Sequence, residues 1–306
     1  MASSAKIIAD SISPTGVRIT TMEAVMHRFV LAEFNTHRVF SRNSASSRAI
    51  PVEKQLEKVI DDPAFPVRWP CEQPGMQGGD DLNGKDLRDA VLLFSDLAAR
   101  ITSEVSAYLA SHHDKSTRLH KSLLNRLLEP FMWHTVIVTS TEWNNFFHQR
   151  ATEFSPLAQP EIAITADLML DAYRASVPVE IDFGEWHLPY IDAETIGWAN
   201  THDIDKIEKN RMLRQISAAR CARVSYLTHD GKRDPAEDIA MHDRLISAVP
   251  MHASPLEHPA TPATMGEISE GNVAGNFYGW HQYRHHIKPH TFDITTVNSE
   301  EIVHEG

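Results

Sequence analysis

The sequence predicts a fold that mixes β-strands with helices. Two segments, 6–12 and 131–139, hold the β-branched or aromatic residues typical of strands. Longer segments such as 85–111 repeat their apolar residues at helical spacing. Hydrophobic residues make up 42% of the 306 residues, enough to bury a substantial core. We therefore expect a globular protein with one large domain or two small ones.

The N-terminal part is expected to pass from strands into a helix. Residues 16–20 are predicted to turn from the first strand into a second extended segment. From Thr21, apolar residues recur at helical spacing and predict an amphipathic helix that leads into Thr36. The Ser/Asn-rich segment after Phe40 has no face to pack and is predicted to be a loop. A helix at 52–60 should follow Pro51, which suits a first helical turn.

Helices dominate the middle of the chain. Four prolines, followed by Gly75, Gly78 and Gly79, predict an irregular excursion over 61–84, a length of loop that is often functional. Helices are predicted at 85–111, 117–129, 141–150 and 161–176, around the strand at 131–139. The helix at 117–129 should bury the following leucines: Leu119, Leu123, Leu124, Leu127 and Leu128.

The distribution of proline and glycine suggests three regions. Residues 1–176 are predicted to form a core, 177–209 a linker, and 210–306 a C-terminal segment that completes the site. Helices are expected near 210–222 and at 235–249, the second capped by Asp234. The aromatic segment 276–283 is compatible with a strand or with the start of a helix.

Charge and cysteine content limit the partners and the cellular compartment that we expect for the protein. A formal net charge of -12 disfavours a long nucleic-acid track, although a small anionic ligand remains possible. The apolar runs are too short to span a membrane, and the N-terminus lacks the pattern of a signal peptide. Two cysteines, Cys71 and Cys221, fit a reducing compartment. We expect a cytoplasmic protein that binds neither nucleic acid nor a membrane.

The stretch Thr36–Arg48 is the most distinctive in the sequence. It holds one histidine, three arginines, four serines, a threonine and an asparagine. Arginine forks and hydroxyl groups replace the hydration of a phosphate group by bidentate, charge-assisted hydrogen bonds. Composition alone leaves two interpretations of equal weight, a phosphate site and a solvated surface loop.

Two further stretches carry chemically interesting residues. One runs from Asn125 to Ile162, where Trp143, Phe146 and Phe147 are better explained as core than as a cofactor stack. The other joins 219–226 to 251–258. Cys221 could be a nucleophile, but a buried cysteine at a helix end is the commoner state. The chain has 18 histidines but no metal-binding spacing, so no metal is expected.

Together these stretches resemble the flavin-dependent thymidylate synthase family. Its signature is of the type Arg-His-Arg-x-x-Ser-x-Asn-Glu-x-Ser-x-Arg, and the residues that match in register are His37, Arg38, Ser41, Asn43, Ser46 and Arg48. A later element of the family is similar to Thr139…Asn145…Arg150…Ala158-Gln159-x-Glu161-Ile162. Its Ala-Arg-Val-Ser and His-x-Ser-Pro-x-Glu-His elements correspond to 222–225 and 252–258.

The order of these elements is unusual. In compact family members the last two elements precede the arginine signature, whereas here they follow it. The chain therefore resembles a circularly permuted or rearranged member of the longer type found in phages and some bacteria. The resemblance implies a mixed α/β (α+β) fold, a sheet packed with helices, in a homotetramer.

The resemblance also implies ligands and roles for individual residues. The substrate would be dUMP, with Arg38, Ser46, Arg48 and Arg126 binding the nucleotide. FAD would be the cofactor, and the residues that contact it would be His37, Asn43, Asn145, Ser225 and His252. Arg150 would be the catalytic residue that polarises the pyrimidine. NADPH would reduce the flavin and methylene-tetrahydrofolate would supply the one-carbon unit that converts dUMP to dTMP.

Two departures from the signature leave other reactions open. Thr36 replaces the first arginine and Ser44 replaces the glutamate. Arg42, which the signature does not specify, could compensate for Thr36. The alternatives are a related C5 modification, such as hydroxymethylation of a pyrimidine deoxynucleotide, and a nucleotide-binding homologue without catalysis.

Overall fold

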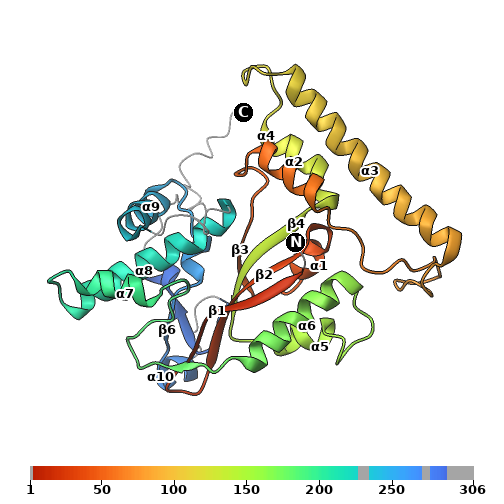
Figure 1. Cartoon of the computed structure of the whole chain (residues 1–306). Coiled ribbons are helices and arrows are strands. Elements are labelled where there is room, and N and C mark those ends of the chain that lie inside the picture. The colour runs from red at the N-terminus through yellow and green to blue at the C-terminus, as the bar shows by residue number, and fades with distance from the viewer. Residues whose placement is uncertain (1–2, 227–233, 271–275, 288–306) are drawn as a thin grey trace, which may run out of the picture.

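The computed structural model describes residues 3–226, 234–270 and 276–287. A five-stranded sheet lies at its centre and is flanked by helices (Figure 1). The strand order is β3-β4-β2-β1-β5. The strands are β1 (Ser4–Ile12), β2 (Arg18–His27), β3 (Ser41–Ser44), β4 (Trp133–Ser140) and β5 (Val179–Glu180). Every pairing is antiparallel except that of β1 with β5, so the predicted mixed α/β class is confirmed.

The helix predicted from Thr21 is wrong, because β2 continues as a strand to His27. This strand is paired on both sides, with β1 and β4. A strand that is buried on both faces carries apolar residues at consecutive positions, and these happened to match a helical period. Helical structure is limited to a 3-10 turn at Arg28–Val30 and to α1 (Leu31–Phe34).

The loop predicted after Phe40 is also partly wrong, since Ser41–Ser44 form the edge strand β3. Ser41 pairs with Thr139, and Asn43 pairs with Ile137. The strand is polar because its buried residues, Ser41 and Asn43, hydrogen-bond to groups outside the sheet. An amphipathic pattern could not have revealed a strand of this kind.

One face of the sheet packs against α5 (Asn144–Arg150) and α6 (Pro160–Ala175). Met22, Ala24 and Met26 of β2 meet the aromatic side chains of this layer in the largest buried cluster. Trp143, Phe146 and Phe147 are all buried there, so their interpretation as core residues is confirmed. This cluster fixes α5 and with it the polar residues on its outer side.

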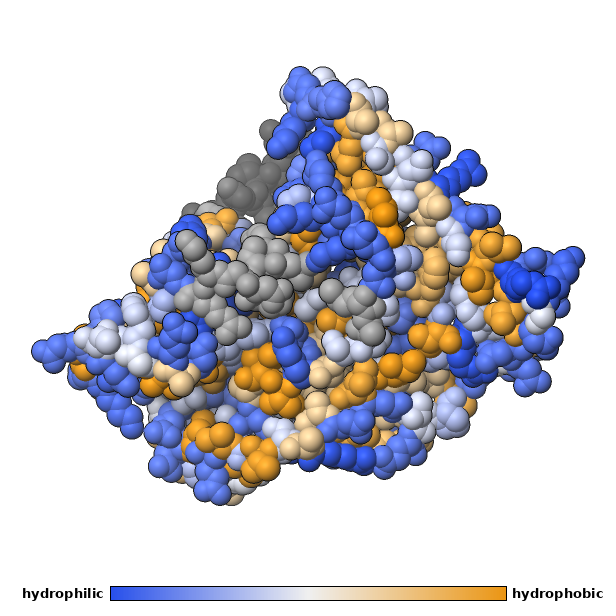
Figure 2. All heavy atoms as spheres, in the orientation of Figure 1, coloured by the Kyte–Doolittle hydropathy of each residue, from blue (hydrophilic) through white to orange (hydrophobic). Residues whose placement is uncertain are grey.

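A second cluster joins α2 (Val52–Asp61), α3 (Gly84–Ser111) and α4 (Lys121–Leu128). Residues 62–83, between α2 and α3, are irregular, as predicted for 61–84 apart from one helical residue at each end. Helix α4 is shorter than expected and buries Leu124 and Leu128, whereas Leu119, Leu123 and Leu127 are exposed. Helix α3 runs along the outside of the molecule, and Figure 2 shows apolar side chains along it. Its exposed leucines are Leu92, Leu93 and Leu97.

The C-terminal part packs beside β3. It comprises α7 (Ala193–Asn200), α8 (Lys206–Arg223), α9 (Pro235–Ser247), β6 (Ala260–Pro262), α10 (Met265–Ser269) and β7 (Trp280–Gln282). The Asp234 side chain caps α9 by accepting from Ala236 N at 2.9 Å, as predicted. The segment with two interpretations contains strand β7, followed by a 3-10 turn at Tyr283–His286.

The stretch 177–209 contains β5, α7 and the beginning of α8. Its backbone joins the C-terminal part at His187, which donates to Ala260 O at 2.8 Å and accepts from Ala260 N at 3.2 Å. The division into core, linker and C-terminal segment stays a prediction. Among the described residues, no helix is long and apolar enough to cross a membrane.

Candidate functional site

The three stretches that stand out in the sequence meet around β3. Ser46 N donates to Ser225 O at 2.9 Å, which joins the arginine stretch to the end of α8. Gln282 Nε2 donates to Ser41 Oγ at 2.8 Å. The side-chain amide of Asn43 lies 3.3 Å from His258 Nε2. Segments that are separated by about two hundred residues therefore surround one short polar strand.

His37, Asn145 and Arg150 form one cluster. Arg150 Nε donates to His37 Nε2 at 3.3 Å, and the His37 ring packs edge-on against Phe146 with 5.0 Å between ring centroids. The pKa of His37 is lowered to about 4, chiefly by burial and then by the charges of Arg150 and Arg42, while a hydrogen bond with Asn145 opposes the shift. The imidazole is therefore uncharged at neutral pH and acts as an acceptor at Nε2.

Arg38, Arg42 and Arg48 differ in their surroundings. Arg42 is half-buried and donates to the carbonyls of Phe34 at 3.2 Å and His37 at 3.4 Å, which holds the turn before β3. Burial and the charge of Arg38 lower the pKa of Arg42, and Glu257 opposes this shift. Arg38 and Arg48 are exposed, and no carboxylate within 3–226, 234–270 and 276–287 pairs with either. Such guanidinium groups can receive an anionic ligand.

Glu129 anchors the loop that carries Ser46 and Arg48. Its carboxylate accepts from Ser47 Oγ at 2.5 Å and from Arg28 Nη2 at 3.1 Å. Arg126 Nη1 lies 3.7 Å from the other carboxylate oxygen and is otherwise exposed. Arg126 is thus brought beside the loop, as a shared phosphate site would require.

Asn125 gives the same loop a second attachment. Its Nδ2 donates to Ser47 O at 2.8 Å and to Ile50 O at 2.9 Å from a fully buried position. Sequence reasoning did not assign a role to Glu129, Ser47 or Asn125. The only available signal was the position of Asn125 and Glu129 on either side of Arg126, next to Pro130.

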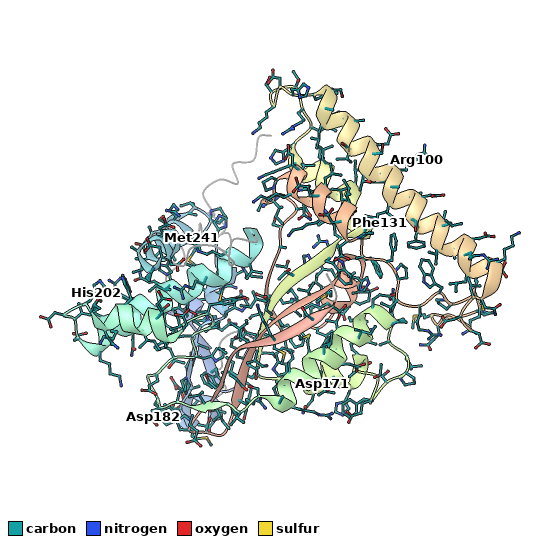
Figure 3. All side chains as sticks on the ribbon, viewed as in Figure 1. Arg100, Phe131, Asp171, Asp182, His202 and Met241 are labelled. Atoms are coloured by element: carbon teal, nitrogen blue, oxygen red, sulfur yellow. The ribbon has the colours of Figure 1, made fainter. Side chains whose placement is uncertain are left out.

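His252 lies in a different environment. With Arg223 of α8 and Arg244 of α9, it lines an open pocket of about 670 Å³. Met241, labelled in Figure 3, belongs to the same pocket on α9. His252 is exposed, and its backbone N donates to Leu245 O at 3.0 Å. Of the residues expected to contact FAD, the structure groups His37 with Asn145 and joins Ser225 to Ser46, while His252 faces this separate pocket.

A buried chain of hydrogen bonds leads from Asn43 across the sheet. His258 Nδ1 lies 2.8 Å from Thr139 Oγ1, which lies 2.6 Å from Thr21 Oγ1. Thr21 Oγ1 is 2.8 Å from His187 Nε2, and His187 Nδ1 is 2.9 Å from Ser11 Oγ. Both threonines and both histidines are fully buried. The chain links β3, β4, β2 and β1 on the face opposite to α5 and α6.

The direction of this chain follows from its Asn43 end. With its nitrogen turned toward the carbonyls of Arg42 and Ser254, the amide donates at 3.0 and 3.1 Å. The nitrogen, whose two hydrogens go to these carbonyls, then also faces His258 Nε2; an N–H group there would oppose it, so Nε2 is unprotonated and Nδ1 of His258 carries the proton. Burial lowers the pKa of His258 and of His187 to about 3, which keeps both rings neutral. Each group can then donate to the next as far as Ser11.

Cys221 and a metal site can be assessed directly. Cys221 is fully buried beside Ile137 and Val224, and burial raises the pKa of its thiol well above the ordinary value. The buried structural cysteine, the commoner of the two interpretations, fits this environment. No group of three His, Cys, Asp or Glu side chains in the described part of the chain could hold a metal ion.

Comparisons with known proteins give only weak likenesses. No family model and no curated protein matches the chain. A solved UMP/dUMP methylase, PolB from Streptomyces cacaoi bound with 5-Br UMP, is 15% identical over 56% of this chain and 88% of that chain, with a TM-score of 0.42. Thymidylate Synthase X (ThyX) from Helicobacter pylori, solved with FAD and dUMP, is 17% identical over 51% of this chain and 67% of that chain, with a TM-score of 0.33. Likenesses of this size assign neither a family nor an activity.

Proposed function

We propose that this protein is a flavin-dependent thymidylate synthase. It would transfer a one-carbon unit from methylene-tetrahydrofolate to C5 of dUMP and give dTMP, with NADPH as reductant and FAD as cofactor. The observation that carries the proposal is the meeting of three sequence stretches around β3, in which Ser46 bonds to Ser225 and Asn43 approaches His258. These are the stretches whose residues resemble the family's signatures.

The residues around β3 suit an anionic nucleotide. Arg38, Arg48 and Arg126 would hold its phosphate by charge-assisted hydrogen bonds, with Ser46 as a hydroxyl donor. Glu129 and Asn125 hydrogen-bond to Ser47 in the loop at Ser46–Arg48, so the donors of this loop are positioned before a ligand binds. A site that is preorganised in this way loses less conformational entropy on binding.

The neighbouring cluster suits a flavin. His37 is uncharged and buried beside Asn145, so the pair offers neutral hydrogen-bonding groups rather than a second anion site. Asn43 and Ser225 would complete the cofactor contacts around this cluster, while His252 would contact FAD from the separate pocket between α8 and α9. FAD would supply the hydride chemistry. Arg150, which donates to His37 Nε2, would polarise the pyrimidine and stabilise negative charge on its ring.

A related C5 modification, hydroxymethylation of a pyrimidine deoxynucleotide, is the second candidate. It is favoured by Thr36, which stands where the signature has its first arginine. The Thr36 hydroxyl donates to Glu33 O at 2.6 Å. The loss of that cation, and of the glutamate at Ser44, alters the ligand contacts that the family would use. The third candidate is a protein that binds the nucleotide without catalysis.

One set of experiments separates the three candidates. Purified protein is first titrated with FAD and followed by its visible absorbance. It is then incubated with FAD, NADPH, methylene-tetrahydrofolate and either dUMP or dCMP, and the nucleotide is weighed by mass spectrometry. A gain of a methyl group supports the synthase and a gain of a hydroxymethyl group the second candidate. Nucleotide binding without any flavin spectrum would refute the flavin-dependent synthase, and an unchanged nucleotide mass would refute the second candidate.

Arg48→Ala supplies a specific test of the phosphate site. It should weaken dUMP binding at least about tenfold, because a charge-assisted hydrogen bond is lost. Arg100→Ala is the matched control, since Arg100 is exposed on the outer helix α3 (Figure 3). The proposed homotetramer is measured separately by size-exclusion chromatography with light scattering.

A further inference from the structure

A cavity of about 730 Å³ lies between the loop at 66–82, the N-terminal part of α3 and the start of α6. Figure 1 shows this loop at the N-terminal end of α3. The cavity volume is within the range of about 300–1,000 Å³ that is typical of small-molecule sites. None of the residues that line it is assigned above to the nucleotide or to the flavin.

Two hydrogen bonds attach the loop at 66–82 to the start of α6 and to the segment before it. Val67 N donates to Glu161 Oε1 at 2.9 Å. Gln77 Nε2 donates to Leu157 O at 2.8 Å. These two walls of the cavity are therefore fixed to each other, so less conformational entropy is lost when a ligand binds between them.

A series of aromatic rings runs from the interior of the molecule to the cavity. Phe131, labelled in Figure 3, is buried and meets Phe94 edge-on with 6.4 Å between ring centroids. Phe94 meets Trp69 in the same way at 5.0 Å. Phe94 and Trp69 line the cavity, and both are only partly buried. An aromatic ligand would extend this series at Trp69, because aromatic pairs gain energy beyond that of their buried area.

Other lining residues expose apolar surface to solvent. Met76 is fully exposed and Leu157 is 68% exposed, so a ligand that covers them removes apolar area from water. A methionine sulfur also makes favourable contacts with aromatic rings. The lining includes five prolines, which lose no side-chain entropy on binding: Pro66, Pro70, Pro130, Pro156 and Pro160. These walls favour a rigid, apolar ligand.

The two charged residues that line the cavity already have partners. Arg68 Nε lies 3.1 Å from Asp81 Oδ2. Glu161 is buried, and its carboxylate accepts from Val67 N and, at 3.0 Å, from Gln159 Nε2. An ionic ligand would therefore bring a charge that the walls do not pair, which is unfavourable. The ligand that fits is neutral.

We propose that this cavity binds a neutral aromatic molecule of two or more rings, which packs against the side chains of Trp69, Met76 and Leu157. Shape and apolar contact select such a ligand, and no phosphate group is needed. Binding there is a second property of the protein, separate from the proposed synthase reaction, and does not depend on it.

Three related probes test the chemistry of the ligand: 2-naphthol, its saturated analogue decahydro-2-naphthol, and the anion 2-naphthoate. Their binding to the whole chain is measured by calorimetry. 2-Naphthol should bind about three- to tenfold more tightly than the saturated analogue, because only an aromatic ring extends the series at Trp69. 2-Naphthoate should bind at least about tenfold more weakly than 2-naphthol. Equal affinities for the first two probes, or no binding of 2-naphthol, would overturn the proposal.

Variants of two lining residues locate the binding. Trp69→Ala should weaken 2-naphthol binding at least about tenfold, and Leu157→Lys, which changes only an exposed side chain, at least about threefold. The matched controls are Trp198→Ala on α7, also only partly buried, and Ile207→Lys on α8, also exposed; neither residue lines the cavity. Thermal unfolding with a single cooperative transition confirms that each variant folds. Unchanged affinity in Leu157→Lys and in a folded Trp69→Ala would overturn the proposal.

Saturating FAD and dUMP distinguish this cavity from the proposed nucleotide and flavin site. The affinity for 2-naphthol should be unchanged in their presence. If they displace 2-naphthol while Trp69→Ala leaves its affinity unchanged, 2-naphthol occupies the nucleotide or flavin site, and the cavity proposal fails while the proposed function stands. If neither FAD nor dUMP binds but 2-naphthol binding still depends on Trp69, the proposed function fails and the cavity proposal stands.

Discussion

The hydroxyl oxygens of Thr21 and Thr139 lie 2.6 Å apart on directly opposed residues of β2 and β4. Both side chains are fully buried, and each also faces a histidine, His187 in one case and His258 in the other. The pair therefore joins two imidazoles that lie on separate segments of the chain. The strand register, and not sequence proximity, makes this connection.

Thr139→Val should destabilise the protein by about 1–3 kcal/mol. Valine keeps the shape of threonine but leaves the His258 Nδ1–H without its acceptor and removes the hydrogen bond to Thr21, which keeps only His187. The free energy of unfolding is measured by chemical denaturation. Thr165→Val is the matched control, because the Thr165 hydroxyl is buried but donates only to Glu161 O within α6. An equal loss in the two variants would show that the chain across the sheet adds nothing.

The stability of the protein should fall as the pH is lowered from about 6.5 toward 3. Burial lowers the pKa of His134, His187 and His258 to about 3, whereas histidines in the unfolded chain titrate near their ordinary value of 6.5. Between these values the unfolded state binds more protons than the folded state, so stability increases with pH. Each histidine adds a slope of up to about 1.4 kcal/mol per pH unit.

This dependence is checked by chemical denaturation at pH 7 and pH 5. His187→Gln removes one of the buried histidines whose pKa is lowered and should reduce the difference in stability between pH 7 and pH 5. His148→Gln is the control, because His148 is exposed on α5. The explanation fails if His187→Gln and the unmodified protein lose the same stability between pH 7 and pH 5.

Arg150→Gln should raise the pKa of His37 from about 4. The charge of Arg150 is the second-largest cause of the lowered value after burial, so part of the shift should remain. Titration of the His37 ring by NMR gives the pKa directly, and Arg100→Gln on α3 is the control. If the proposed function is correct, the same variant loses most of its dTMP formation. An unchanged His37 pKa would contradict the contact between the two residues.

Glu129→Ala should destabilise the protein by about 3 kcal/mol. The change removes the acceptor of Ser47 and the partner of Arg28, whose side chain is 16% exposed and would keep a mostly buried charge. Glu129→Gln should cost less, since its side-chain oxygen can still accept from Ser47. Chemical denaturation compares the two. Equal losses would indicate that charge alone, and not the hydrogen bond to the loop, gives Glu129 its effect.

Helices with clear boundaries could be predicted from the sequence. Asp234 and Pro235 define the start of α9, and the long apolar period of α3 is hard to mistake. Strand β2 could not be recognised, because its burial comes from neighbours on both sides that the local sequence does not contain. The polar residues of β3 likewise form a strand and not the predicted loop, because they contact segments that are distant in the sequence.

The residues of the candidate site were likewise only partly predictable from the sequence. The arginine stretch was evident because its residue types are concentrated within thirteen positions, and His37, Asn145 and Arg150 do meet. Glu129 and the chain from Ser11 to His258 could not be foreseen. Ser11 and His187 are 176 positions apart, and the local sequence around either residue does not indicate that they are in contact. Whether these groups bind the ligands that we propose stays a prediction.

The residues that contact β3 lie late in the sequence, and this affects how the chain folds during its synthesis. Asn43 meets His258 across 215 positions, so the ribosome synthesises the arginine stretch long before the segment that completes its surroundings. Contacts of such long range form slowly, because a large loop must close first. A nascent chain that has reached only α6 would leave the outer edge of β3 open to pair with other chains. We therefore expect translation that stops before α8 to yield aggregates rather than a partly active protein.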